Sequence, residues 1–146
     1  MMASGPLRVL LIEDNPTDAL LLRESLAAHQ PCEFTVFANG GQVCDFLQGR
    51  GQFAETGLPD LVVLDLHVPG KDGFEVLNFI RGSVELRDLV VAVVSTWPAD
   101  FVAKKAAQAD CHVQKPSDLD EFLALGRTIL DCYLRRRPIT PPVQAA

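Results

Sequence analysis

The sequence predicts an α/β fold in which helices cover both faces of one parallel sheet. Three short segments, at residues 9–12, 61–64 and 90–94, consist almost entirely of aliphatic residues. Continuous aliphatic runs of this length are typical of strands that are buried on both faces, as in parallel sheets. Segments with helical spacing of apolar residues lie between them, and this alternation is the pattern of doubly wound folds.

The chain is expected to alternate between strand and helix five times. The strands are predicted at residues 9–12, 33–38, 61–64, 90–94 and 111–114. The helices are predicted at residues 17–29, 41–48, 72–81, 98–108 and 117–136. Residues 50–59 are rich in glycine and polar side chains, which predicts a longer surface loop before the third strand.

Local signals support the helices. The apolar faces of the first and third helices are expected to carry Leu21, Leu22 and Leu26, and Phe74, Val76, Leu77 and Ile80, respectively. The fourth helix is predicted to begin at Pro98, because proline is tolerated in a first helical turn. Ser117 is the expected N-cap of the last helix.

These elements are expected to form a single domain. With 146 residues, the chain has room for one domain and not for two, so no attached output domain is expected. We expect an N-terminal extension at residues 1–6, the domain at residues 7–136 and a flexible tail at residues 137–146. Three prolines prevent regular structure in this tail.

Composition argues against several classes of partner. The net charge of −6 repels a phosphate backbone, so nucleic-acid binding is not expected. The apolar segment at residues 7–12 is far shorter than the roughly 20 residues that span a bilayer, so no membrane contact is expected. The four cysteines form no C-x-x-C pair, which favours a reduced, cytoplasmic protein.

Polar side chains gather where the predicted strands end. They are Glu13 and Asp14 after the first strand, Asp65 after the third, Ser95 after the fourth and Lys115 after the fifth. In an open parallel sheet, the carboxyl ends of the strands form the ligand-binding edge. A single aspartate at such a position is usually a turn or cap residue, but carboxylates and a lysine at several strand ends are not explained in that way.

The three carboxylates predict a divalent metal ion, because they repel one another unless a cation compensates their charge. Hard oxygen ligands that leave room for water and phosphate suit Mg²⁺ better than zinc. Lys115 adds a point charge and Ser95 adds a hydroxyl donor. Together these groups are suited to stabilising a phosphoryl group that is transferred to an aspartate.

The same residues resemble the signature of response-regulator receiver domains of two-component signalling. The resemblance rests, in order and spacing, on Glu13-Asp14, Asp65, Ser95 and Lys115-Pro116. It covers residues 7 to about 135 and implies the flavodoxin-like strand order 2-1-3-4-5. The stretch from Asp65 to Gly73, the long loop before Pro59, and Cys111 resemble the single-domain regulators that are paired with phytochrome-type histidine kinases.

The resemblance implies a role for each residue of the set. Asp65 would be the nucleophile that accepts phosphate from the phosphohistidine of a sensor histidine kinase. Asp14 and Asp65 would bind Mg²⁺ directly, Glu13 through water, and His67 through its backbone carbonyl. The protein would then catalyse only its own phosphorylation and dephosphorylation, and it is not expected to be an enzyme otherwise.

The resemblance also implies a switch. Lys115 would hold a phosphoryl oxygen and Ser95 would move toward the phosphate. His112 occupies the place of the aromatic switch residue, whose inward rotation would signal through helix 98–108, strand 111–114 and the last helix. A half-buried structural ring is the alternative interpretation of His112.

Three departures from the family pattern stand out. The interval from Ser95 to Lys115 is about two residues shorter than usual, so the helix at residues 98–108 or the loop after it must be trimmed. His67 is an unusual residue beside the path of an attacking water, and Thr96 is larger than the alanine often found there.

Two other functions use similar residues. A phosphatase of the haloacid dehalogenase type also has an aspartate nucleophile, but it needs a second acid where this chain has His67, and its nucleophile follows the first strand. A flavodoxin-like FMN carrier needs a first loop rich in glycine and hydroxyl groups, whereas Glu13 and Asp14 would repel the phosphate.

The last helix is more apolar than one core contact requires. Its wide apolar face is expected to carry Phe122, Leu123, Ile129, Leu130, Tyr133 and Leu134, with Leu119, Leu125 and Cys132 outside the centre. The excess predicts a homodimer through helix 98–108, strand 111–114 and this helix.

Overall fold

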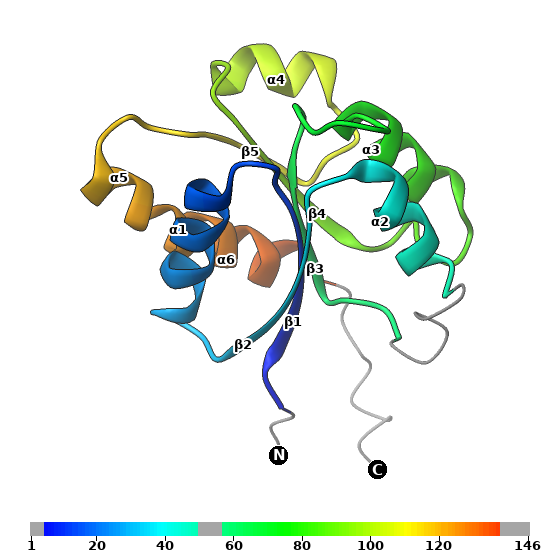
Figure 1. Ribbon diagram of the computed structural model, residues 1–146, viewed down its shortest axis with the longest axis horizontal. Coiled ribbons are helices and arrows are strands. Elements are labelled where there is room, and N and C mark those ends of the chain that lie inside the picture. Colours follow the sequence, from blue (N-terminus) through cyan, green and yellow to red (C-terminus); the bar gives the residue numbers. More distant parts are fainter. Residues whose placement is uncertain (1–4, 50–56, 138–146) are drawn as a thin grey trace.

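In the computed structural model, which describes residues 5–49 and 57–137, a five-stranded parallel sheet lies between helices on both faces (Figure 1). The strands are β1 (Leu7–Ile12), β2 (Cys32–Phe37), β3 (Leu61–Asp65), β4 (Val90–Ser95) and β5 (Cys111–Gln114). The helices are α1 (Pro16–Ala27), α2 (Gly40–Leu47), α3 (Gly73–Gly82), α4 (Ala99–Lys105), α5 (Leu119–Leu123) and α6 (Leu125–Arg136). The strand order β2-β1-β3-β4-β5 confirms the predicted topology.

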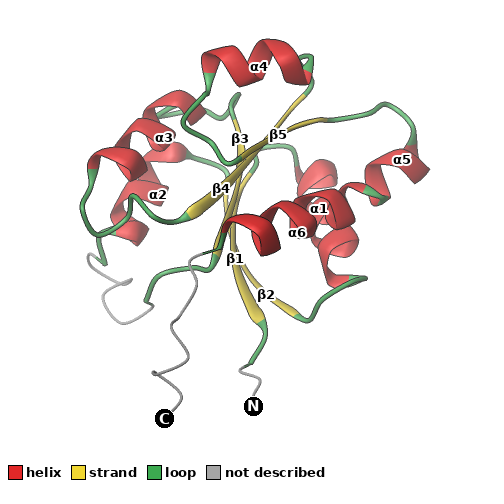
Figure 2. Cartoon of the chain, turned by 180° about the vertical axis from the view of Figure 1, so that it is seen from behind, coloured by secondary structure: helices red, strands yellow, loops and turns green. Residues whose placement is uncertain are grey.

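The two faces of the sheet carry separate cores. Alternate residues of the central strands point to opposite faces, as the two-residue period of a strand requires. On one face, Leu10, Val62 and Val93 pack with α2, α3 and α4. On the other face, Val9 and Val63 pack with α1, α5 and α6. Figure 2 shows α2 and α3 on one side of the sheet and α1, α5 and α6 on the other, with α4 at the top of the view. Both faces are therefore covered, which explains the continuous aliphatic runs in the sequence.

Helix α4 ends three residues before the predicted end at residue 108. Its last helical residue is Lys105, and Ala106 leaves the helical region with φ −123° and ψ 50°. The carbonyl of Ala106 lies 2.7 Å from Nε2 of His112 on β5. The same carbonyl also accepts a hydrogen bond of 3.0 Å from the Ala109 N–H, so it has two donors where the helix stops.

The prediction of one continuous last helix is wrong, because the helix is broken at Ala124. The Ser25 hydroxyl of α1 donates to the Leu123 carbonyl and accepts from the Gly126 N–H, both at 2.6 Å. These two backbone groups thus bond to a buried side chain. A Cβ on Gly126 would collide with the Ser25 carbonyl, so only glycine permits this close approach.

The structure also corrects two other details of the predicted last helix. The N-cap is Asp118 and not Ser117, because the Asp118 side chain accepts a hydrogen bond from the Glu121 N–H. Leu125 and Cys132, which were expected outside the centre of the apolar face, are buried in the core, whereas Leu134 is 56% exposed.

Several expectations concern residues outside the described part of the chain. These are residues 1–4 of the expected extension, residues 50–56 of the expected loop and residues 138–146 of the expected tail. Within the described residues, none of the helices has the length and apolar character that crossing a membrane demands.

Candidate functional site

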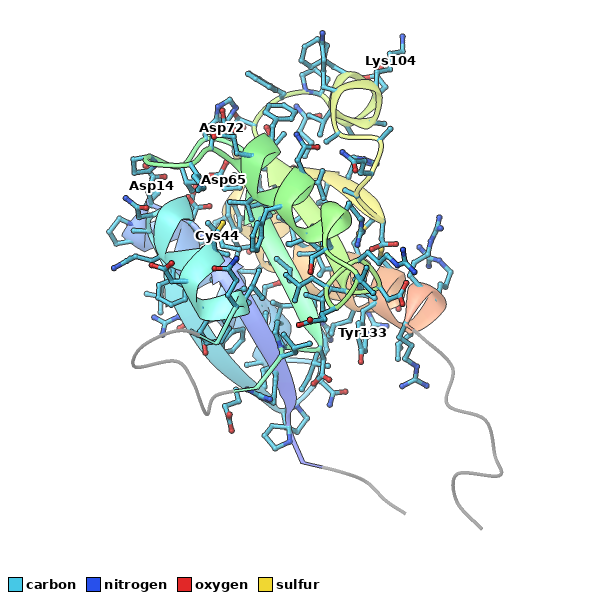
Figure 3. The ribbon with its side chains drawn as sticks, turned by 90° about the vertical axis from the view of Figure 1, so that its right-hand side faces the viewer. Asp14, Cys44, Asp65, Asp72, Lys104 and Tyr133 are labelled. Carbon is cyan, nitrogen blue, oxygen red and sulfur yellow. The ribbon has the colours of Figure 1, made fainter. Side chains whose placement is uncertain are left out.

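The predicted polar residues meet at one end of the sheet, where the strands terminate. Asp65 is the last residue of β3 and Ser95 the last residue of β4, while Glu13 and Lys115 follow β1 and β5 directly. Figure 3 shows Asp14 and Asp65 at this end of the molecule, with Tyr133 toward the other end. Because the strands are parallel, Glu13 and Lys115 are in direct contact although they are 102 positions apart in the sequence.

Three carboxylates at this edge are close enough to share a cation. Glu13, Asp14 and Asp65 each offer an oxygen, and these oxygens all lie within 4.8 Å of one another. Glu13 and Asp65 are buried, and Asp14 is exposed, so the cluster is open to solvent on one side. Hard oxygen donors in this number fit a divalent ion such as Mg²⁺ or Mn²⁺, which retains water ligands.

Lys115 is held by three carboxylates at once. Its ammonium group lies 2.6 Å from Glu13 Oε1 and 2.9 Å from Asp65 Oδ2. The third partner is Asp18, whose Oδ2 lies 2.9 Å from the same nitrogen. The lysine side chain is only 6% exposed. An ammonium group has three donors, so every one of them is used.

The sequence interpretation missed Asp18. It considered only residues at strand ends, whereas Asp18 lies in the first turn of α1, where its backbone N–H donates to the N-cap side chain of Asn15. The available signal was an acidic residue in the first turn of a helix that begins directly after a carboxylate pair. Helix α1 starts at the same sheet edge, which brings its first turn over the pocket.

The pocket shifts the pKa values of Glu13 and Asp65 in opposite directions. Burial is the main cause that raises the pKa of Glu13 to about 7, and the nearby Asp65 charge adds to it, against the lowering effect of Lys115. Burial also acts on Asp65, but hydrogen bonds from the His67 N–H and from Lys115 outweigh it and lower the pKa of Asp65. Of these two acids, Asp65 is therefore the one favoured in its ionised form, which is the form that acts as a nucleophile.

Both oxygens of Asp65 have defined partners. Oδ1 accepts a hydrogen bond of 2.9 Å from the His67 N–H, and Oδ2 faces Lys115. Behind the carboxylate, a Cβ on Gly73 would lie 2.4 Å from the Cα of Leu66, which explains the glycine at the start of α3. The acceptor side chain is thus fixed in orientation before any ligand arrives.

Ser95 is fully buried beside the pocket. Its hydroxyl accepts a hydrogen bond of 3.1 Å from the Trp97 N–H, and its carbonyl accepts one of 2.7 Å from the Lys115 N–H. The serine therefore links the β4–α4 connection to the residue that carries the ammonium group. The hydroxyl proton itself remains available for an acceptor in the pocket.

The two histidines of the prediction have defined neighbours. The exposed ring of His67 packs edge-on against Trp97, with ring centroids 4.2 Å apart. The half-buried ring of His112 bonds the end of α4 through the Ala106 carbonyl, as described above. This position agrees with a structural ring that joins β5 to the end of α4.

Comparisons with known proteins agree with this geometry. The family model described as response regulator receiver domain matches residues 9–126. The response regulator Rcp1 of Synechocystis sp. is 30% identical over 135 residues, which cover 90% of this chain and 92% of Rcp1. The haloacid dehalogenase alternative receives no support from these similarities.

Two solved structures illustrate the likeness in three dimensions. The phosphorylated cyanobacterial phytochrome response regulator RcpA is 28% identical, with a TM-score of 0.83 over 94% of this chain and 100% of that one. The Mn²⁺-bound form of Rcp1 is 27% identical, with a TM-score of 0.81 over 93% of this chain and 100% of that one.

Proposed function

The chain belongs to the response regulator receiver domain family, and from this premise we propose that Asp65 accepts a phosphoryl group from a sensor histidine kinase. The observation that carries the proposal is the set of partners of Asp65: a backbone N–H on Oδ1 and the Lys115 ammonium on Oδ2. In the transfer, an Asp65 oxygen forms a bond to phosphorus, and the bond between phosphorus and the donor nitrogen breaks. The electron pair of that bond stays on the departing histidine.

The donor set supports Mg²⁺ as the partner ion. Glu13, Asp14 and Asp65 supply carboxylate oxygens within 4.8 Å of one another, and the His67 carbonyl completes the proposed ligands. The Mn²⁺-bound form of Rcp1 supports this choice, because Mn²⁺ has similar ligand preferences. When bound, such an ion supplies positive charge that offsets the repulsion between carboxylates and phosphoryl oxygens.

In this proposal, Lys115 and Ser95 bind the phosphoryl group, and His112 transmits the resulting change. Lys115 exchanges its contact with the Asp65 carboxylate for one with a phosphoryl oxygen, because its ammonium already lies 2.9 Å from the acceptor oxygen. Ser95 donates its free hydroxyl proton to another phosphoryl oxygen, which changes the contact of its hydroxyl with the Trp97 N–H. His112 carries the change to α4, since its ring bonds the last turn of that helix.

The output surface in this proposal is formed by α4, β5 and the α5–α6 segment. Large apolar side chains are exposed there, namely Phe101 at 44%, Leu119 at 57% and Leu134 at 56%. Such exposure supports a homodimer through this face. Light scattering at micromolar concentration, with and without phosphorylation, tests it, and a monomeric mass in both conditions contradicts it.

The kinase in this proposal is of the phytochrome type. Support comes from the similarity to RcpA, a cyanobacterial phytochrome response regulator. The four free cysteines suit a reducing compartment, in agreement with a cytoplasmic location. The net charge of −6 is unfavourable for nucleic acid, so the partners are proteins.

The experiment that tests the function is intact mass spectrometry. The protein is incubated with Mg²⁺ and acetyl phosphate, beside the Asp65→Asn variant and a sample with EDTA. One added phosphoryl group in the unmodified protein, absent from both controls, is the expected result. Addition to the Asp65→Asn variant contradicts the assignment of Asp65. If only a phosphorylated histidine kinase transfers the group, the acceptor assignment stands and the small-molecule donor is excluded.

A further inference from the structure

We propose that Asp18 is a positioning residue for the phosphoryl-transfer reaction, because it holds the Lys115 ammonium in the acceptor pocket. The inference rests on the proposed function of Asp65. Asp18 lies outside the carboxylate cluster formed by Glu13, Asp14 and Asp65, yet its Oδ2 is 2.9 Å from Lys115 Nζ. It is therefore a ligand of the lysine and not a member of the metal cluster.

The three partners of Lys115 differ in what happens to them during the reaction. Glu13 and Asp65 belong to the cluster that would share its charge with a cation. Asp65 in addition loses its carboxylate charge when it becomes an acyl phosphate. Asp18 takes part in neither event, so it is the counter-ion that Lys115 keeps throughout.

A fixed counter-ion matters because of the length of the lysine side chain. Lysine has four methylene groups between Cα and the ammonium, and an unrestrained side chain of this kind samples many rotamers. Asp18 has a short side chain, and its backbone is anchored by the Asn15 N-cap at the start of α1. A carboxylate in this first turn is also stabilised by the helix dipole. Through the contact between Asp18 and Lys115, helix α1 thereby fixes the end of β5 relative to Asp65 at the end of β3.

The kinetic test compares the Asp18→Asn variant with the unmodified protein. We expect Asp65 to be phosphorylated by acetyl phosphate roughly tenfold more slowly in the variant at saturating Mg²⁺. Asp18 acts through Lys115, so its loss should cost less than the roughly hundredfold that follows from misplacing a group by 1 Å. Asp100→Asn is the matched control, because Asp100 is also an acidic residue in a first helical turn, but its carboxylate accepts a hydrogen bond from the neighbouring Phe101 N–H. This control is expected to react at the unmodified rate.

A second measurement needs neither metal nor phosphate. The chain has four lysines, of which Lys71, Lys104 and Lys105 are exposed. In nitrogen-15 NMR of the metal-free protein, a lysine ammonium is visible only when hydrogen bonds slow the exchange of its protons. One such signal is expected, and it should disappear in Lys115→Met and weaken strongly in Asp18→Asn, but not in Asp100→Asn.

The outcomes separate this inference from the proposed function. If the unmodified protein reacts and Asp18→Asn reacts equally fast or faster, Asp18 does not position the lysine and the inference is overturned. A loss of rate that disappears when Mg²⁺ is raised also overturns it, because Asp18 then acts through the ion. If the unmodified protein is not phosphorylated by any donor, the function fails, while the ammonium signal still decides whether Asp18 holds Lys115. Circular dichroism and thermal unfolding confirm that each variant is folded.

Discussion

Lys115 Nζ lies 2.6 Å from Glu13 Oε1, although the two residues are 102 positions apart in the chain. This contact joins the end of β5 to the end of β1 across the acceptor pocket, and both side chains are almost completely buried. A buried charge is tolerated only when it is paired, so the fold at this edge depends on the balance between one ammonium and several carboxylates.

Replacing Lys115 by methionine is therefore expected to destabilise the metal-free protein. The variant leaves Glu13 and Asp65 buried without their cation, and breaking such a pair costs about 3–5 kcal/mol. Mg²⁺ should restore more stability to the variant than to the unmodified protein, because it supplies the missing charge. Urea unfolding in EDTA and in Mg²⁺ measures both effects. Lys104→Met, at an exposed position of α4, is the control, and an equal loss in both variants contradicts the argument.

The stability of the metal-free protein is expected to fall as the pH rises from about 4.5 to about 7. The pKa of Glu13 is raised from 4.5 to about 7 in the folded state, mainly by burial. The folded state then binds more protons than the unfolded state in this window, so raising the pH favours unfolding. Asp65 acts in the opposite sense, but its lowered pKa places its effect below this window.

The Glu13→Gln variant tests this dependence. Glutamine has nearly the same shape and does not titrate, so the decline between these pH values should flatten. The free energy of unfolding in EDTA, measured with urea at pH 5 and pH 7.5, gives the slope for each protein. An unchanged slope in Glu13→Gln shows that another group is responsible.

Removing the Ser25 hydroxyl is expected to destabilise the junction between α5 and α6. In Ser25→Ala, the Leu123 carbonyl and the Gly126 N–H lose a partner to which each is bonded at 2.6 Å. Leaving buried polar groups unpaired costs about 1–3 kcal/mol. Thermal or urea unfolding measures the loss. Ser117→Ala is the matched control, because Ser117 is exposed and does not cap the helix, and it should stay within about 0.5 kcal/mol of the parent.

The ring of His112 is expected to hold the end of α4 in place. His112→Phe keeps an aromatic ring on β5 but removes the donor to the Ala106 carbonyl, which costs about 1 kcal/mol. Hydrogen exchange should accelerate in the last turn of α4 and remain unchanged in α3. If exchange is unaffected, the contact has no role in fixing α4. If phosphorylation of His112→Phe no longer alters hydrogen exchange in α4, the ring also transmits the effect of phosphorylation to this helix.

The order of strands and helices was predictable because it depends on local patterns. Aliphatic runs such as the one ending at Leu64 must be covered on both faces, and parallel strands then place their carboxyl ends together. The cluster of Glu13, Asp14 and Asp65 follows from this rule alone. These features are encoded by residues that are near one another in the chain or that occupy equivalent positions on successive strands.

The tertiary structure decided the features that depend on contacts between distant segments. Asp18 meets Lys115 only because α1 begins above the end of β5, and no spacing rule links a first-turn residue to a strand end. The last helix breaks because Ser25 of α1 bonds Leu123 and Gly126 across the packing interface. In both cases a side chain far away in the sequence supplies a hydrogen-bond partner, and a pattern read along one segment contains no information about it. The sequence therefore determined which groups gather at the sheet edge, and packing between helices and strands determined how those groups are held.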